Sequence, residues 1–279
     1  MDIGYLGPKG SFTHAAAKAF FQTETLTSYP TLIQLIDARV AGQIDYAVVP
    51  VENTIEGSVL QTIDGIYQNL PTIQGEITLK IEQQLMVRPE YAERWKEAEL
   101  VCSHPQALAQ CQTFIREYFP AAEIEQMAST TLGAKRVAET PQKIIASIGS
   151  CTAAREFDLT IVKRNIQSVE NNETRFWLLG DQPVESQLNF QRQKATLLVD
   201  LPFDRPGALY HLLALFAEAK INLTKIESRP QKTQLGEYFF IIDLEVPKDL
   251  QTLDRVIHLL SQQEFPVKFV GNYPTYRKP

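Results

Sequence analysis

The sequence predicts an α/β protein made of two unequal domains. Over residues 1–182, short apolar runs alternate with helical patterns, which is the βαβα order of a mostly parallel sheet. A polar, glutamine-rich stretch follows at 183–194 and is interpreted as a linker. Residues 195–279 then have the order βαββαβ, the ferredoxin-like arrangement.

The elements predicted in the first domain are short buried strands and amphipathic helices. The ligand site of such a sheet lies at the carboxyl ends of strands and the amino ends of helices. The predicted strands are Ile3–Leu6, Tyr46–Val49, Ile77–Val87, Leu100–Cys102, Ile124–Met127, Ile144–Ser147 and Phe176–Leu179. The predicted helices are Thr13–Phe21, Leu32–Ala41, Val59–Tyr67, Pro105–Phe119, Leu132–Ala138 and Thr152–Phe157.

The second domain is predicted to contain four strands and two helices. A core of roughly 80 residues is marginal by itself, so pairing with a second copy is expected. The predicted strands are Ala195–Leu201, Leu223–Ser228, Tyr238–Val246 and Val267–Val270, and the helices are Gly207–Lys220 and Leu250–Gln263.

The composition excludes several classes of protein. The 279 residues are 44% hydrophobic and 22% charged, with a net charge of −6, which is ordinary for a soluble globular chain. The basic residues are scattered, so no nucleic-acid partner is expected. The apolar segments are too short to span a bilayer, and the start, MDIGYLG, lacks the basic region of a signal peptide. Three cysteines without CxxC spacing favour buried thiols and a cytoplasmic location.

The common catalytic and cofactor motifs are missing. The sequence has neither a GxSxG elbow nor a GxxxxGK[ST] loop. Its four histidines are far apart, with no HxxxH or HxH pair, so no metal site is expected. The segment GYLGPKG lacks the GxGxxG spacing of a dinucleotide site.

Polar residues gather instead at predicted loop-to-helix junctions. These junctions are GPKGSFTHAAA, VPVENTIEGSV, VCSHPQALAQC and ASTTLGAKRVAE. Each Ser or Thr can be a simple N-cap, worth about 1 kcal/mol. Several helix starts together can also form an anion-binding mouth. Asn53 and Gln110 do not need to be caps, and their amides could hold a polar ligand.

The segments GPKGSFTHAAA, VENTIEGSV, SHPQALAQC and NETRFWLLG resemble, in order, the motifs of the prephenate dehydratase family. The segment GALYHLLALFAEAKINLTKIESRP resembles the ACT regulatory domain of that family. The resemblance implies a two-lobed catalytic domain like a periplasmic binding protein, followed by an ACT domain. Thr54 departs from the family pattern, where Ser is expected. Because the pattern begins at Ile3, no chorismate mutase segment is expected before it.

The resemblance implies conversion of prephenate to phenylpyruvate, water and carbon dioxide. Formation of the aromatic ring supplies much of the driving force, so neither a metal nor an organic cofactor is expected. By resemblance, Thr174 is the catalytic residue and is assigned to the departing hydroxyl as hydrogen-bond donor or general acid. Asn53, Ser103 and Gln110 are expected to complete an uncharged, substrate-binding lining. His104 is either an acid or a structural residue at its helix start.

Two residues beside Thr174 are also assigned to substrate binding. Arg175 can anchor a carboxylate with two parallel hydrogen bonds. The alternative is an ion pair between Arg175 and an acid such as Glu173 or Glu52. Phe176 is expected to pack in the wall of the cleft, with stacking on the ligand as the alternative.

The resemblance places a phenylalanine effector in the ACT domain, between two subunits of a homodimer or homotetramer. Without it, the same residues would be ordinary turn and helix-start residues. The implied effector residues are Gly207, Ala208, Leu209, Asn222, Glu227, Ser228 and Arg229.

Two alternatives to a prephenate dehydratase stay open. Arogenate dehydratase acts on a substrate with an amino group in place of the keto group. A non-catalytic amino-acid sensor would suit the two-lobed layout equally well. Because every catalytic motif precedes Pro183, the catalytic part is expected to be active without the ACT domain.

Overall fold

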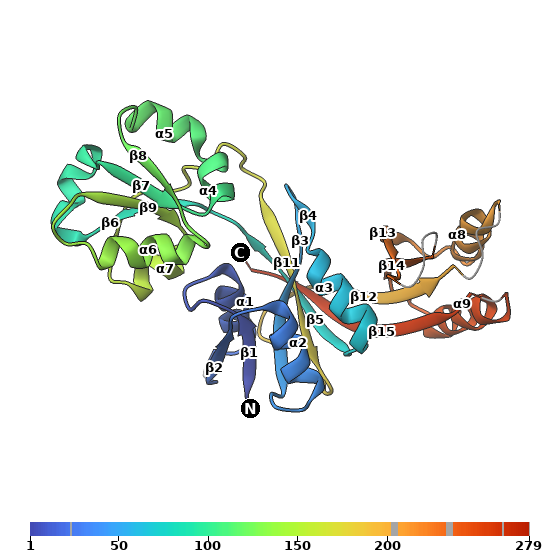
Figure 1. Cartoon of the computed structure of the whole chain (residues 1–279). Helices are drawn as coiled ribbons and strands as arrows, with labels where there is room; N and C mark the ends of the chain where they lie inside the picture. Colours follow the sequence, from blue (N-terminus) through green and yellow to red (C-terminus); the bar gives the residue numbers. More distant parts are fainter. Residues whose placement is uncertain (23, 202–205, 233–236, 264, 279) are drawn as a thin grey trace.

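The computed structural model describes residues 1–22, 24–201, 206–232, 237–263 and 265–278. The chain forms two α/β lobes and a C-terminal α/β domain (Figure 1). In Figure 1 the second lobe, the first lobe and the C-terminal domain follow one another from left to right. This confirms the predicted two-lobed domain followed by a βαββαβ domain.

The first lobe is a mixed sheet with the strand order β5-β11-β3-β1-β2, in which β4 pairs with β3. Strand β11 returns from the second lobe and lies antiparallel to both β3 and β5. The elements are β1 (Ile3–Leu6), α1 (Phe12–Phe20), β2 (Leu26–Tyr29), α2 (Leu32–Val40), β3 (Tyr46–Asn53), β4 (Gly57–Ser58), α3 (Leu60–Asn69), β5 (Ile73–Lys80) and β11 (Glu173–Gly180).

The second lobe has a five-stranded sheet of order β10-β6-β9-β7-β8. The chain enters this lobe through residues 81–83 and leaves it through 164–172. The single helix predicted over Pro105–Phe119 is broken at Cys111. The elements are β6 (Gln84–Val87), the 3₁₀ segment η1 (Pro89–Glu97), β7 (Leu100–Ser103), α4 (Pro105–Gln110), α5 (Gln112–Tyr118), β8 (Glu123–Gln126), α6 (Thr130–Ala138), β9 (Ile145–Gly149), α7 (Cys151–Glu156) and β10 (Thr160–Lys163).

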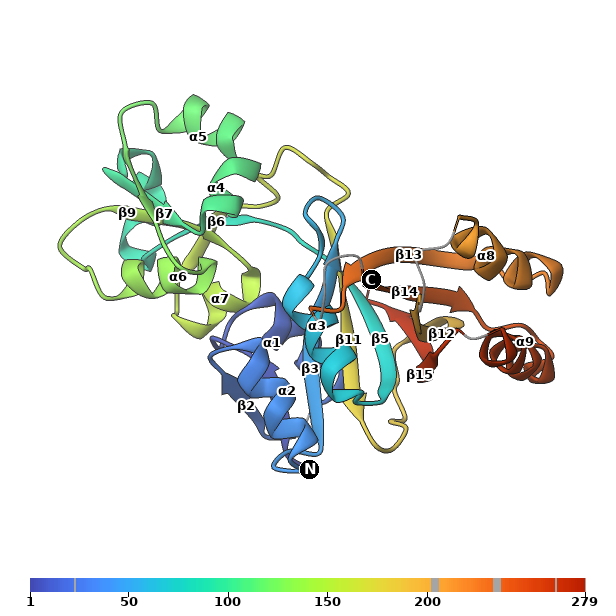
Figure 2. The same ribbon diagram turned by 45° about the vertical axis from the view of Figure 1, so that its right-hand side comes forward.

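The C-terminal domain has the sheet order β13-β14-β12-β15. Its helices cover one face of this sheet, as Figure 2 shows from a second side. The elements are β12 (Asn189–Asp200), α8 (Ala208–Glu218), β13 (Leu223–Pro230), β14 (Tyr238–Glu245), α9 (Leu250–Gln262) and β15 (Val267–Arg277).

The sheets of the first lobe and the C-terminal domain are continuous. Strand β15 pairs in parallel with β5, with Tyr276 opposite Ile77. Gly271 permits this close approach, because a Cβ there would lie 2.5 Å from the carbonyl oxygen of Ile73. Residues 189–194, which the sequence suggested were linker, already belong to β12. They read as a linker because most of their polar side chains are exposed, and their strand partner, β15, comes late in the chain.

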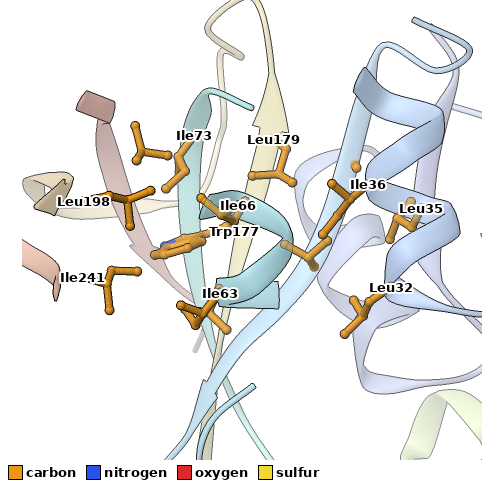
Figure 3. Close-up of a cluster of buried hydrophobic side chains, with 14 of the residues drawn as sticks. Leu32, Leu35, Ile36, Ile63, Ile66, Ile73, Trp177, Leu179, Leu198 and Ile241 are labelled. Carbon is orange, nitrogen blue, oxygen red and sulfur yellow. The ribbon is translucent and has the colours of Figure 1, made fainter. Parts of the chain in front are cut away.

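The two domains share one hydrophobic core (Figure 3). Ile63 and Ile66 of α3 and Trp177 of β11 cluster with Leu198 and Ile241 of the C-terminal sheet. All five side chains are at most 1% exposed. A chain ending near Pro183 would uncover this core, so the structure argues against an independent catalytic part.

A buried group of charges lies at the same junction. The Arg175 guanidinium contacts Glu52 at 2.6 Å, Glu76 at 2.5 Å and Asp243 of β14 at 2.6 Å. The Lys194 ammonium lies 3.1 Å from Glu76. Burial alone would raise the pKa of the Glu76 carboxyl, but Arg175 and Lys194 outweigh it and hold that pKa below its usual value.

Replacing Arg175 tests how far this charge cluster stabilises the fold. Arg175→Met would leave Asp243 and Glu76 buried without their main counter-charge. Breaking a buried pair in this way costs about 3–5 kcal/mol. We expect a loss of that size in the free energy of unfolding, measured with urea. Arg192→Met is the matched control, because the Arg192–Glu245 pair is half exposed, and should cost within about 1 kcal/mol. Equal small losses would show that the cluster contributes no special stability.

Candidate active site

A cavity of about 360 Å³ lies between the two lobes. It is bordered by the starts of α1, α4 and α6, by the end of β3 and by the start of β11. Its polar lining includes Ser11, Thr13, Asn53, Gln83, His104, Gln110, Ser129, Thr131, Asn172 and Thr174.

Thr174 and Asn53 are brought together by strand pairing. Thr174 of β11 lies opposite Asn53 of β3, and the Asn53 side-chain Nδ2 donates to Thr174 Oγ1 at 2.9 Å. The next pair, Arg175 and Glu52, joins the charge cluster and does not line the cavity. Because side chains alternate along a strand, the neutral pair and the charged pair lie on opposite sides of the sheet.

Two further amides extend this contact toward the second lobe. Asn53 Nδ2 also donates to Asn172 Oδ1 at 2.7 Å. The Asn172 side-chain Nδ2 donates to Gln110 Oε1 of α4 at 3.2 Å. Asn53 Oδ1 accepts from the backbone N–H groups of Ile55 and Glu56 at 3.0 and 3.2 Å. The amides therefore connect the first lobe to the second across the cavity.

The helix starts confirm the N-cap interpretation and also face the cavity. Ser11 Oγ accepts from a backbone N–H of α1 at 3.2 Å, and Ser129 Oγ accepts from one in α6 at 3.1 Å. His104 Nδ1 accepts from the backbone N–H of Gln106 at 3.4 Å, so His104 does serve its helix start. Within the described chain, Glu56 is the one charged carboxylate in the lining, and no Lys or Arg lines it. The helix ends therefore supply the positive potential.

His14 holds the loop that borders the cavity. Its side chain is buried and stacks on Tyr5, with ring centroids 4.8 Å apart. His14 Nδ1 accepts from the backbone N–H of Gly10 at 3.0 Å. Burial lowers the pKa of His14 to about 4, so the ring is neutral at physiological pH.

Comparison with known proteins identifies the family. Residues 3–184 match the prephenate dehydratase family model, and residues 195–258 match the ACT domain model. A prephenate dehydratase of Bacillus subtilis (strain 168) is 42% identical over 284 aligned residues, covering 99% of this chain and 100% of the relative. The chain belongs to the prephenate dehydratase family. Its second domain is an ACT domain.

Two solved structures have the same fold as this family member. The prephenate dehydratase from Arthrobacter aurescens in complex with L-Phe has a TM-score of 0.81 and 30% identity, covering 98% of this chain and 90% of that chain. A structure described as GqqA, a novel type of quorum quenching acylase, has a TM-score of 0.84 and 25% identity, covering 99% and 98%. One fold thus carries two described activities, so the reaction must be argued from the site.

Three predicted site residues meet in the cavity, and three do not. Asn53, Gln110 and Thr174 line it, and their roles stay predictions. Ser103 does not line it, because this fully buried hydroxyl donates to the Ile148 carbonyl at 2.6 Å inside the second lobe. The predicted place of Ser103 in the cavity lining is therefore corrected.

The expected substrate contacts of Arg175 and Phe176 are also corrected. Arg175 takes the alternative of an ion pair with Glu52, whereas Glu173 pairs with Arg277. Phe176 is 1% exposed and packs in the core beneath α1, not in the wall of the cleft. The reason is that β11 leaves the cleft immediately after Thr174 and runs into the body of the first lobe.

Sequence reasoning missed Asn172 and Gln83. Asn172 is 1% exposed and stands two residues before Thr174, which is the one local signal that could have indicated it. Gln83 is 3% exposed and lies where the chain crosses into the second lobe. Its Oε1 has no partner among the described residues. Only the tertiary fold brings Gln83 to the cavity.

The searches for metal and membrane sites concern the described residues. Among them, no group of three or more His, Cys, Asp or Glu side chains could hold a metal ion. In the same part of the chain, no helix has the length and apolar content needed to span a bilayer. Of the three free cysteines, Cys102 and Cys111 are buried as predicted, whereas Cys151 is exposed.

The implied effector residues lie around α8 and on β13. Gly207 has φ +87° at the N-cap of α8, where a side chain would strain the backbone. The left-handed residue after α8 is Lys220, with φ 55°, rather than Asn222. Glu227 contacts Ser58 of β4, and Arg229 pairs with Asp64 of α3 at 3.0 Å. These two side chains therefore connect the ACT domain to the first lobe.

The pKa of His14 gives a test of its buried, neutral state. A pKa of about 4 lies below the ordinary value of 6.5. Between pH 6.5 and 4, the unfolded chain binds a proton at His14 that the folded chain does not bind. The free energy of unfolding therefore decreases as the pH falls from 6.5 toward 4. In His14→Gln, we expect a shallower fall of the free energy of unfolding over this window. The exposed His258→Gln is the control and should keep the wild-type slope. An unchanged slope in His14→Gln would contradict the assignment.

Proposed function

We propose that the interlobe cavity converts prephenate to phenylpyruvate. In this reaction the bond from the ring to its carboxylate breaks, and the electron pair of that bond enters the ring. The carbon–oxygen bond on the opposite side of the ring then breaks, and the leaving hydroxyl takes up one proton. The products are phenylpyruvate, carbon dioxide and water. The observation that carries the proposal is the Asn53–Thr174 hydrogen bond in a cavity without cationic side chains among the described residues.

Thr174 is suited to assist the departing hydroxyl. Its oxygen already accepts from Asn53, and its hydroxyl hydrogen has no acceptor in the described part of the chain. The hydrogen is therefore free to be donated to a ligand. Because threonine is a very weak acid, it donates most strongly as the leaving oxygen becomes hydroxide-like. The bond from Asn53 holds the Thr174 oxygen in place during that step.

A lining without cationic side chains among the described residues suits the departing carboxylate. Prephenate carries two carboxylates, and one of them leaves as neutral carbon dioxide. A cation beside that group would stabilise the bound substrate more than the transition state and slow the reaction. The helix starts bordering the cavity can bind the carboxylate that stays, through backbone N–H groups.

Thr174→Val tests the catalytic assignment. Valine keeps the shape and removes the hydroxyl, so we expect kcat to fall by about 10²–10⁴-fold, with KM changed far less. Phenylpyruvate formation measures the rate. Thr113→Val, on the exposed surface of α5, is the matched control and should keep wild-type turnover. Near-normal turnover in folded Thr174→Val would remove Thr174 from this role.

Three rival functions are separated by one set of assays. Arogenate dehydratase predicts a higher kcat/KM on arogenate than on prephenate. A sensor predicts binding without turnover. An acylase, the activity described for one solved structure of this fold, predicts hydrolysis of an amide. Phenylpyruvate formation from prephenate at a higher kcat/KM than from arogenate supports the proposal over all three.

We also propose that phenylalanine regulates the enzyme through the ACT domain. Strand β13, which carries the implied effector segment, holds the first lobe directly. Lys225 Nζ donates to Glu52 at 2.9 Å and to Ser58 Oγ at 2.6 Å, and Ser58 donates to Glu227. Ser58 and Glu52 pair in the β3–β4 hairpin that also carries Asn53. A shift of β13 would thus move the hairpin that holds Thr174.

Two interdomain contacts of β13 allow a matched test of this route. Ser58→Ala removes the hydroxyl that joins Lys225 and Glu227 of β13 to the hairpin and leaves the Lys225–Glu52 contact. Asp64→Asn weakens the Arg229 contact, which goes to α3 instead. Allosteric coupling is typically about 5–150-fold in affinity. Because the Lys225–Glu52 contact stays in place, we expect Ser58→Ala to make the effect of phenylalanine on the prephenate KM smaller than in the wild type, and Asp64→Asn to keep the wild-type effect.

Thermal melts check that both variants still bind phenylalanine, which should add about 2.7 kcal/mol of stability at about 100 times Kd. Full coupling in Ser58→Ala would contradict the hairpin route. The homodimer or homotetramer and the cytoplasmic location stay predictions.

A further inference from the structure

We propose that Asn172 is a positioning residue that makes Thr174 and Gln110 present hydrogen-bond donors to the substrate from opposite lobes. This inference rests on the proposed function of the cavity. Asn172 itself does not need to touch the substrate. It acts through the two amides that it connects, Asn53 and Gln110.

The direction of the hydrogen bonds begins at the backbone. The N–H groups of Ile55 and Glu56 can only donate, and both point to one end of the Asn53 amide, at 3.0 and 3.2 Å. That end must be Oδ1. The opposite end, Nδ2, therefore faces Thr174 and Asn172 and can only donate to them.

Asn172 passes this direction to the second lobe. Since Asn53 Nδ2 must donate, Asn172 accepts with its Oδ1, at 2.7 Å. The Nδ2 of Asn172 then faces Gln110 and requires the Oε1 end of that amide, at 3.2 Å. Gln83 Nε2 approaches the same oxygen at 3.4 Å. The Nε2 of Gln110 has no partner among the described residues and belongs to a side chain that lines the cavity.

Burial and the backbone keep Asn172 in this role. Its side chain is 1% exposed, so bulk water does not compete for its amide. Its carbonyl accepts from the backbone N–H of Ile81 at 2.8 Å, where the chain crosses between the lobes. The Nδ2 of Asn53 carries two hydrogens, and one of them is donated to Asn172 Oδ1. Thr174 Oγ1 at 2.9 Å and the Glu173 carbonyl at 3.2 Å compete for the other.

The outcome suits the reaction. The leaving hydroxyl becomes hydroxide-like and requires donors, not acceptors. With Asn172 in place, Thr174 has a free O–H and Gln110 has a free N–H. If Asn172 could not donate, Gln110 would be free to turn over and present its oxygen to the substrate. A carbonyl oxygen beside a developing negative charge opposes the reaction.

Asn172→Asp tests this relay with an almost isosteric change. An ionised carboxylate still accepts from Asn53 but cannot donate to Gln110, so the Gln110 amide reverses. We expect kcat/KM about 10-fold lower or more at pH 8, because a polar partner is mismatched inside the site. As the pH falls through the pKa of the new carboxyl, its O–H can donate to Gln110 again. Activity relative to wild type should therefore rise as the pH falls.

Two further variants separate the relay from simple loss of structure. Asn171→Asp places the same charge one residue away on an exposed side chain. Asn171→Asp should keep the wild-type pH profile, because Glu56 and His104, the titratable groups of the lining, are the same in both proteins. Asn172→Leu should be slow at every pH, with no recovery in acid. In a double-mutant cycle, Asn172→Asp combined with Gln110→Ala should be no slower at pH 8 than Gln110→Ala alone.

Several results would overturn the inference. An Asn172→Asp profile parallel to that of Asn171→Asp, or fully additive effects with Gln110→Ala, would show that no direction is relayed. Melting curves of Asn172→Asp at each pH show whether the change in rate follows unfolding, which would also count against the relay. If the wild type forms no phenylpyruvate, the proposed function fails. The relay is then judged on prephenate affinity, which should show the same acid recovery in Asn172→Asp.

Discussion

The Arg175 cluster is the constraint on which the rest of the structure depends. Its guanidinium meets carboxylates from β3, β5 and β14, that is, from both neighbouring strands and from the ACT domain. Buried charges must be paired, so these contacts define how β11 aligns with its neighbours. Thr174 precedes Arg175 in β11, and the same alignment places Thr174 opposite Asn53. The register that satisfies the charges therefore also brings Thr174 and Asn53 together at the cavity.

One strand thus serves two surfaces that have different functions. In β11, Thr174 faces the cavity and Arg175 faces the ACT domain. In β3, Asn53 and Glu52 divide in the same way, and Glu52 also binds Lys225 of β13. A single peptide unit separates the side chain that lines the cavity from the one that makes the interdomain contacts. A regulatory signal that changes the charged contacts therefore needs to travel only across the thickness of one sheet, and no long chain of intermediate residues is required.

The sequence was sufficient for the order of elements and for much of the site. The amides of Asn53 and Gln110 were indicated by polar residues at strand ends and helix starts, which gather at one edge of an α/β sheet, whereas Thr174 was assigned by resemblance to the family. Ser103 and Arg175 were misplaced because Ser103 directly precedes the N-cap His104 and Arg175 directly follows Thr174, whereas Phe176 lies two residues beyond Thr174, where β11 has already entered the core. Local pattern does not tell which side of the sheet such a neighbour faces. Asn172 and Gln83 depended on how the two crossings between the lobes meet, which is a tertiary feature.

The distribution of charge between the two surfaces explains how the cavity can be held rigidly without cationic side chains in the described part of its lining. Three cations near β11, namely Arg175, Lys194 and Lys225, lie behind the sheet and are bound to carboxylates there. They hold the strands in place by strong interactions at a distance from the substrate. The cavity itself uses amides, a hydroxyl and helix ends, which are weaker but directional. Such groups can bind a dianion while leaving one carboxylate free to depart, because no cation stabilises it. The direction of each amide then decides whether the site favours the leaving hydroxyl, which makes a buried neutral residue such as Asn172 as important as a charged one.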